Sequence, residues 1–298
     1  MLLNTKIPFS YIVKKIKLEL LYVIIIATVV KILASKYRDI IPEMPISIPA
    51  FIGTAISIIL SFKLNQSYDR WWEARKIWGA IVNDSRSLVL LLQSFLPTNK
   101  NKEIEEITYR QIAWCYSLGQ SLRAQDPLLN MEQLLTVDDI NILEKHNNKP
   151  LGILQLNTLQ IRSLKEQNKI SDYNHVQLTS ILTRFSDSMG MAERINNTVF
   201  PMTYKMLLHF MIYIFVITLS LALGEIDSIY ELPLLIIVSA TFLLLEKTAT
   251  HMQDPFENRP TDIPVTAIAT TIDINLRQLI NDHQNIPAPY KAKGFYSL

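Results

Sequence analysis

Cysteine and glycine are both scarce in this chain of 298 residues. The single cysteine, Cys115, cannot form an internal disulfide, and the five histidines include no Cys/His group with zinc spacing. The seven glycines form neither a GxxxxGK nor a GxGxxG motif. The hydrolase signatures HExxH and GxSxG are missing as well. We therefore expect no metal, no cofactor and no catalytic residue.

An excess of either charge is also lacking, since 29 Lys and Arg stand against 27 Asp and Glu, a formal net charge of +2. Nucleic-acid-binding proteins concentrate basic residues on one face, so this balance argues against a nucleic-acid partner. Hydrophobic residues make up 49% of the chain, and the mean hydropathy is +0.18. This composition is more apolar than that of an ordinary soluble protein and indicates contact with a membrane.

Four apolar stretches form two pairs at opposite ends of the chain and predict transmembrane helices over about 18–36, 46–64, 204–223 and 231–246. Each is short for a lone span, and Lys31, His209 and Glu246 lie in or beside them. Such segments suit a bundle or an oligomer, where polar side chains find partners. We expect His209 to make a polar contact between helices, and the alternatives are a pH-sensitive group or a residue near the interface. Buried helices of a soluble protein are the alternative interpretation.

Cationic residues gather before the first span and in the long middle of the chain, whereas the loop GEIDSIYE has none. By the positive-inside rule, both termini and the regions of about 65–203 and 247–298 are expected to be cytoplasmic. Helical periodicity predicts a bundle of helices there, with Thr136 and Ser171 as N-caps. The fold class is therefore an all-α membrane protein, a single domain over 1–298 whose four spans continue into a cytosolic helical bundle.

The second stretch carries two parallel stripes of residues at a spacing of four, which places each stripe on one helix face. The small residues Gly53, Ser57 and Ser61 would let a neighbouring helix approach closely. Beside them lie Thr54, Ile58 and Phe62, which would then turn towards a central axis. Repeated around an oligomer, the bulky apolar residues form a constriction that excludes water and ions until it widens. The alternative is that this stripe faces lipid or another helix.

The sequence SYDRWWEARKIWGAIVNDSR follows at residues 67–86 without proline and reads as a continuing helix. Trp71, Trp72 and Trp78 are candidates for anchors at the membrane interface. Glu73 can pair with Lys76, three residues further along the helix.

SYDRWWEARKIWG after an apolar helix, together with DPFENRPTDIPV near the C-terminus, resembles the bestrophin family, especially its bacterial members. The resemblance covers nearly the whole chain and implies a homopentamer in the bacterial cytoplasmic (inner) membrane, in contact with lipid, with one central pore for small monovalent ions. It places the pore neck at Thr54, Ile58 and Phe62, and a second constriction at the cytosolic exit at Tyr173. The chain departs from the family at Thr54, where an apolar residue is usual, and at Tyr173, where an aliphatic one is common.

The DPFENRPTDIPV motif has too few carboxylates for the calcium site of the animal bestrophins, because calcium takes six to eight oxygen ligands. We expect no calcium site here. Asp262 is expected instead to cap a helix that starts near Pro264.

An uncharged neck does not by itself distinguish cations from anions. The acidic residues Glu43, Glu225 and Asp227 lie near the expected pore mouth and favour cations slightly. Two other functions stay open: a membrane-anchored enzyme with a cytosolic site, and a membrane scaffold that does not conduct.

Overall fold

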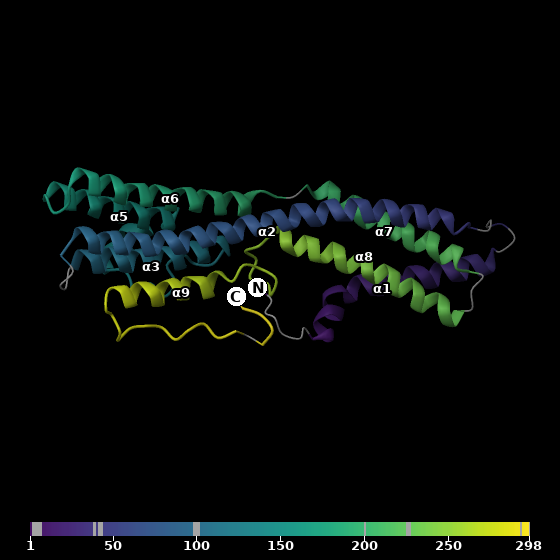
Figure 1. Ribbon diagram of the computed structural model, residues 1–298. Coiled ribbons are helices and arrows are strands. Elements are labelled where there is room, and N and C mark those ends of the chain that lie inside the picture. Colours follow the sequence, from purple (N-terminus) through teal and green to yellow (C-terminus); the bar gives the residue numbers. More distant parts are fainter. Residues whose placement is uncertain are drawn as a thin grey trace. The chain divides into compact units, whose positions relative to one another are not determined.

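The computed structural model contains nine helices in the part of the chain that it describes, which is residues 1, 8–37, 40, 44–97, 102–199, 201–224, 228–292 and 294–297 (Figure 1). The side chains of residues 228 and 229 are also outside this description. The helices are α1 (Phe9–Lys36), α2 (Ser47–Phe95), α3 (Lys102–Leu122), α4 (Val137–Glu144), α5 (Lys149–Glu166), α6 (Asp172–Asn197), α7 (Met202–Ala222), α8 (Ser228–Gln253) and α9 (Val265–Leu279).

Four of these helices are long and apolar enough to cross a membrane: Phe9–Lys36, Ser47–Phe95, Met202–Ala222 and Tyr230–Gln253 within α8. The predicted all-α class and four spans are confirmed. The second span belongs to a single helix of 49 residues, because the chain from Ser47 to Phe95 has no proline after Pro49 to interrupt it.

The chain divides into two compact units. We call residues 5–70 and 199–253 the membrane unit, because they hold α1, α7, α8 and the first part of α2. Residues 1–4, 71–198 and 254–298 form the bundle unit, which holds the rest of α2 and the other helices. That the two units act together as a single domain over 1–298 stays a prediction.

In the membrane unit, α1, α7 and α8 pack against one another, and α2 contributes one face to the same core. Val23, Ile56, Ile212 and Val216 are fully buried there. Gly53 allows α2 to lie close to α7: a Cβ at this position would lie 3.1 Å from Cε2 of Phe215. This contact is the close approach that the small residue predicts.

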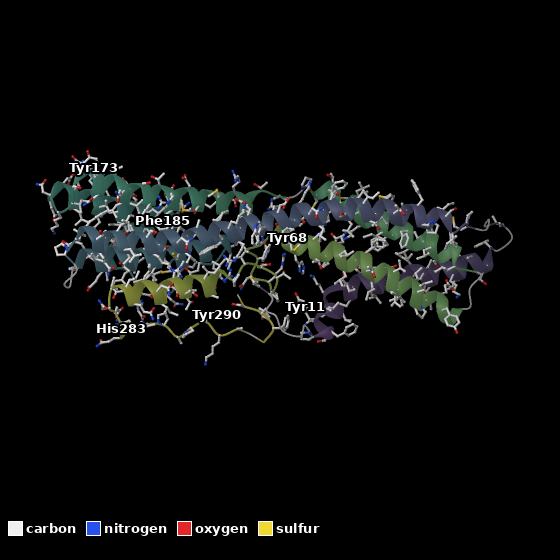
Figure 2. All side chains as sticks on the ribbon, in the orientation of Figure 1. Tyr11, Tyr68, Tyr173, Phe185, His283 and Tyr290 are labelled. Carbon is white, nitrogen blue, oxygen red and sulfur yellow. The ribbon has the colours of Figure 1, made fainter. Side chains whose placement is uncertain are left out.

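In the bundle unit, the core is built around large side chains, including Trp78, Trp114 and Phe185. Figure 2 labels Phe185, whose ring centroid lies 5.0 Å from that of Trp114. The predicted interfacial position is wrong for Trp78, because its side chain is completely buried in this core. Trp71 donates from Nε1 to the Thr261 carbonyl oxygen at 3.1 Å.

Two of the three predicted helix caps are confirmed. Thr136 and Ser171 accept hydrogen bonds from the backbone N–H groups of Asp139 and Asn174. The predicted cap at Asp262 is wrong, because Pro264 is the N-cap of α9 and makes no side-chain cap. The Asp262 carboxylate instead accepts from the Arg259 backbone N–H at 2.9 Å and so holds the turn before the helix.

Candidate ion pathway

The three residues of the predicted neck lie on one exposed face of α2 in the single chain. Ile58 is 55% exposed and Phe62 is 63% exposed, and Thr54 is exposed as well. The Thr54 hydroxyl donates to the Ala50 carbonyl oxygen at 2.9 Å, so its hydrogen-bonding need is met within the helix.

The opposite face of α2 is packed against the rest of the membrane unit. Ile56, Leu60, Lys63 and Ser67 are buried, and they recur at spacings of three and four residues. Helical periodicity places this stripe on the side away from Thr54, Ile58 and Phe62. Whatever fixes the packed stripe therefore also fixes which residues face outward.

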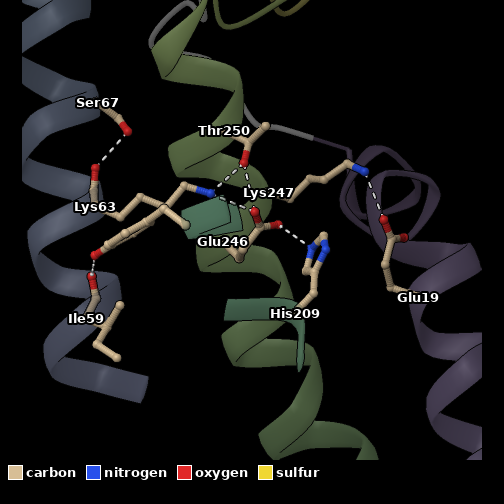
Figure 3. A network of polar contacts seen from close by, with 9 residues as sticks. Glu19, Ile59, Lys63, Ser67, His209, Glu246, Lys247 and Thr250 are labelled. Carbon is tan, nitrogen blue, oxygen red and sulfur yellow. Dashed lines mark hydrogen bonds and ion pairs between the residues drawn. The ribbon is translucent and has the colours of Figure 1, made fainter. Parts of the chain in front are cut away.

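A buried lysine fixes the packed stripe (Figure 3). Lys63 is completely buried, and its Nζ lies 2.7 Å from Oε1 of Glu246 and 2.9 Å from Oγ1 of Thr250, both on α8. The other carboxylate oxygen of Glu246 lies 3.3 Å from Nε2 of His209 on α7. The predicted polar contact of His209 between helices is confirmed. A buried charge is tolerated only when it is paired and hydrogen-bonded, so these contacts set the rotation of α2 about its own axis.

Further polar contacts support this arrangement. The Tyr204 hydroxyl of α7 donates to the Ile59 carbonyl oxygen at 2.9 Å, and Ser67 donates to the Lys63 carbonyl oxygen at 2.7 Å. Lys247 of α8 pairs with Glu19 of α1 at 2.8 Å. Lys31 of α1 also pairs with Glu231 of α8. Each helix of the membrane unit is thus joined to another by a hydrogen bond or an ion pair.

The exposed faces of α1 and α2 differ in composition. Between Leu18 and Leu33, the exposed residues of α1 are apolar apart from Tyr22 and Thr28. Between Ala50 and Phe62, the exposed residues of α2 are Ala50, Phe51, Thr54, Ser57, Ile58, Ser61 and Phe62, so hydroxyl groups interrupt the apolar surface. Small and hydroxylated residues are typical of surfaces between helices in membranes, whereas a continuous apolar face suits lipid.

Of the other predicted site residues, Tyr173 belongs to the bundle unit and the three acidic residues lie outside the described residues. Tyr173 lies near the start of α6, in the bundle unit, and is 84% exposed (Figure 2). Its role as a second constriction stays a prediction. Glu43, Glu225 and Asp227 lie outside the described residues. Within the described ranges, no group of three or more His, Cys, Asp or Glu side chains could hold a metal ion.

The family model for the bacterial and fungal bestrophin proteins matches residues 3–278. The chain belongs to this bestrophin family. A crystal structure of a bacterial bestrophin homologue from Klebsiella pneumoniae superposes with a TM-score of 0.84 at 27% identity, covering 90% of this chain and 99% of that one. The bestrophin fold predicted from the two motifs is confirmed.

Relatives of this bestrophin are named for the formation of channels. The voltage-dependent anion channel-forming protein YneE of Escherichia coli K12 is 32% identical over 250 residues, which cover 84% of this chain and 81% of the relative. A voltage-dependent anion channel-forming protein of Nostoc is 28% identical over 255 residues, covering 82% of each chain. The bestrophin is thus a multi-pass membrane protein of a channel-forming family and not an enzyme. The predicted preference for cations has no support from these relatives, which are named for anions.

Sequence reasoning did not find the pairing of Lys63 with Glu246. Both residues are separated by 183 positions in the chain, so no local spacing connects them. A signal was nevertheless present, because an ionisable residue inside an apolar helix needs a partner, and Glu246 is the acidic residue that ends the fourth stretch.

Proposed function

We propose that this bestrophin assembles into a homopentamer that conducts small monovalent ions along a central axis, with Thr54, Ile58 and Phe62 of each subunit forming the neck. The single observation that carries the proposal is the exposed face of α2, which combines bulky apolar side chains with hydroxyl groups in a membrane-spanning helix. A lipid-facing surface needs no hydroxyl groups. A surface that packs against other subunits and lines a pore uses both bulky apolar side chains and hydroxyl groups.

The neck would act by excluding water. Ile58 and Phe62 offer no polar atoms to an ion, so a narrow ring of these side chains leaves the ion without its hydration shell and closes the path. The exposed hydroxyl-bearing residue Thr54 makes the outer end of the neck wetter. The membrane is the bacterial cytoplasmic membrane, with both termini on the cytoplasmic side. Tyr173 would form the second constriction.

Planar-bilayer recordings from the purified oligomer test this proposal. Under a KCl gradient we expect a current with a defined reversal potential, and Phe62→Ala should raise the conductance at least about threefold because it widens the apolar ring. Phe210→Ala is the matched control: Phe210 is 62% exposed, close to the value of Phe62, but it lies on α7. Its conductance should equal that of the parent.

Two results would contradict the proposal at different points. A well-folded oligomer that carries no current would favour the scaffold over the channel. Equal conductance in the parent and in Phe62→Ala would show that the α2 stripe does not line the path. The relatives named for anions make the sign of the reversal potential informative as well.

A further inference from the structure

The exposed face of α2 becomes polar immediately after the predicted neck. Continuing the stripe at helical spacing, Phe62 is followed by Asn65 and then by Asp69, which are both exposed. Asp69 lies two turns beyond Phe62, a rise of about 10 Å along the helix. The apolar stripe therefore ends in an amide and then in a carboxylate.

Asp69 has no partner that neutralises its charge. Its side chain makes no ion pair or hydrogen bond with any other described residue. The adjacent Arg70 is directed elsewhere, because its Nε donates to the Gln253 carbonyl oxygen on α8 at 2.9 Å. Lys63 is held by Glu246. Arg70 and Lys63 thus make their contacts on the packed side of α2.

Among the next charges along α2, Glu73 and Lys76 compensate each other in an ion pair, as their spacing predicts. Arg75 lies on a different face of the helix from Asp69. Surface carboxylates without a partner are ordinary, but Asp69 is in line with the exposed face that carries Ile58 and Phe62. The same contacts that turn those two residues outward also turn Asp69 outward, because Lys63 and Ser67 lie on the buried side of the same turns.

We propose that Asp69 is a charge-selectivity residue: five Asp69 carboxylates form a ring at the inner end of the neck that attracts monovalent cations and repels anions. This inference rests on the proposed pentameric channel. In the pentamer, each carboxylate lies near four copies of itself around a narrow mouth with apolar walls on one side. Such a site concentrates counter-ions because its low-dielectric wall focuses the field. The field acts locally, since charges are screened within about 8 Å at physiological salt.

The test compares permeability ratios from reversal potentials in a KCl gradient. Asp69→Asn should lower the ratio of potassium to chloride permeability about threefold to tenfold, and Asp69→Lys should lower it further. Asp69→Glu should keep the parent's ratio. Glu132→Gln is the control: Glu132 is an exposed carboxylate in the segment between α3 and α4, and its loss should leave the ratio unchanged.

A second measurement avoids variants that fail to assemble. Asp69→Cys can be modified after assembly with a negatively or a positively charged methanethiosulfonate, which should raise or lower the cation preference respectively. The native thiol does not interfere, because Cys115 is completely buried and burial raises its pKa to about 12. The parent treated with the same reagents is therefore a clean control.

The outcomes separate the two proposals. A parent without current refutes the channel itself. A conducting parent whose permeability ratio does not respond to Asp69→Asn, to Asp69→Lys or to modification of Asp69→Cys refutes the selectivity role alone. A shift towards anions on loss of the negative charge supports the role, whichever ion the parent prefers.

Discussion

The membrane unit and the bundle unit each contain a buried ion pair, Lys63 with Glu246 and Arg277 with Asp273, but the bundle unit also holds the buried Asp262 without an ion pair among the described residues. In the membrane unit, Lys63 meets the carboxylate of Glu246 directly, and both side chains are at most 3% exposed. In the bundle unit, Asp262 accepts hydrogen bonds from the Arg259 backbone N–H and the Thr261 hydroxyl, and the Arg259 and Met1 cations act on it without forming an ion pair. A unit with an apolar exterior needs a full counter-charge, whereas a bundle with a polar exterior tolerates a carboxylate held by dipoles.

The two ways of holding a charge have different consequences. Pairing by an opposite charge makes each partner depend on the other, so removal of one is severe. Holding by dipoles makes the carboxylate sensitive to pH, because burial favours its protonated form. Three sets of variants, one at each type of charge and one at glycines in helix contacts, can break or sharpen this difference.

The largest effect is expected from Lys63→Met. It leaves the buried Glu246 carboxylate without its lysine partner, which should lower the free energy of unfolding by about 3–5 kcal/mol. Thermal unfolding of the protein in detergent measures the loss. Because Lys63 also fixes the rotation of α2, the proposed pore face should be less well defined in this variant, and the single-channel conductance should become heterogeneous.

Two further variants give the matched comparison for Lys63. Lys247→Met breaks the pair with Glu19, whose side chains are 32% and 21% exposed, so the loss should be only about 0–1 kcal/mol. The double variant Lys63→Met with Glu246→Met removes both charges and should recover most of the stability. A double variant as unstable as Lys63→Met would show that the pairing of charge is not what matters.

The sequence supports the general architecture well but not these long-range contacts. Four spans, the caps at Thr136 and Ser171 and the pair of Glu73 with Lys76 follow from local spacing, and all are confirmed. Local rules failed where tertiary packing decides. Trp78 reads as an interfacial residue but is buried, because α2 continues into the bundle core.

The candidate pathway shows the same limit. Periodicity places Thr54, Ile58 and Phe62 on one face, but it cannot say whether that face is packed or exposed. The decisive information is the contact between Lys63 and Glu246, which joins α2 to a helix far along the chain. What surrounds the exposed face in the membrane stays a prediction, because the subunits that would cover it belong to the proposed oligomer.

The next largest effect concerns the pH dependence of the bundle unit. Burial is the main cause that raises the pKa of Asp262 from its ordinary value of 3.8 to about 6. Folding therefore favours the protonated carboxyl, whose contribution to stability is complete below about pH 4 and is lost as pH rises to about 6. The loss should be on the order of 3 kcal/mol.

Asp262→Asn isolates this contribution, because the amide keeps an oxygen acceptor for the Arg259 N–H but does not ionise. The melting temperature of the parent relative to Asp262→Asn should fall by several degrees between pH 4.5 and pH 7.5. The Met1 ammonium, whose pKa burial lowers to about 6, titrates in the same range and interacts with the Asp262 charge, so the difference between the two proteins includes that interaction. Asp254→Asn, in the same segment, should run parallel to the parent. A constant difference between Asp262→Asn and the parent across this range would contradict the assignment.

The smallest effect compares one helix contact at a glycine in each unit. A Cβ on Gly119 of α3 would lie 2.5 Å from Cγ1 of Val265 on α9, so Gly119→Ala forces backbone or side-chain movement and should cost about 1–3 kcal/mol. A Cβ on Gly53 would lie 3.1 Å from the edge of the Phe215 ring, which needs to move by only a few tenths of an ångström. The gain in helix propensity of up to about 1 kcal/mol should nearly cancel that strain in Gly53→Ala.

Gly190→Ala completes this comparison, because a Cβ there meets no other atom within 4 Å and only the propensity gain remains. The expected order of thermal stability is Gly190→Ala highest, Gly53→Ala near the parent and Gly119→Ala lowest. Equal losses in Gly53→Ala and Gly119→Ala would mean that α2 lies as tightly against α7 as α3 lies against α9. The rotation of α2 would then be held by steric packing as well as by Lys63, and Lys63→Met alone would not disturb the pore face.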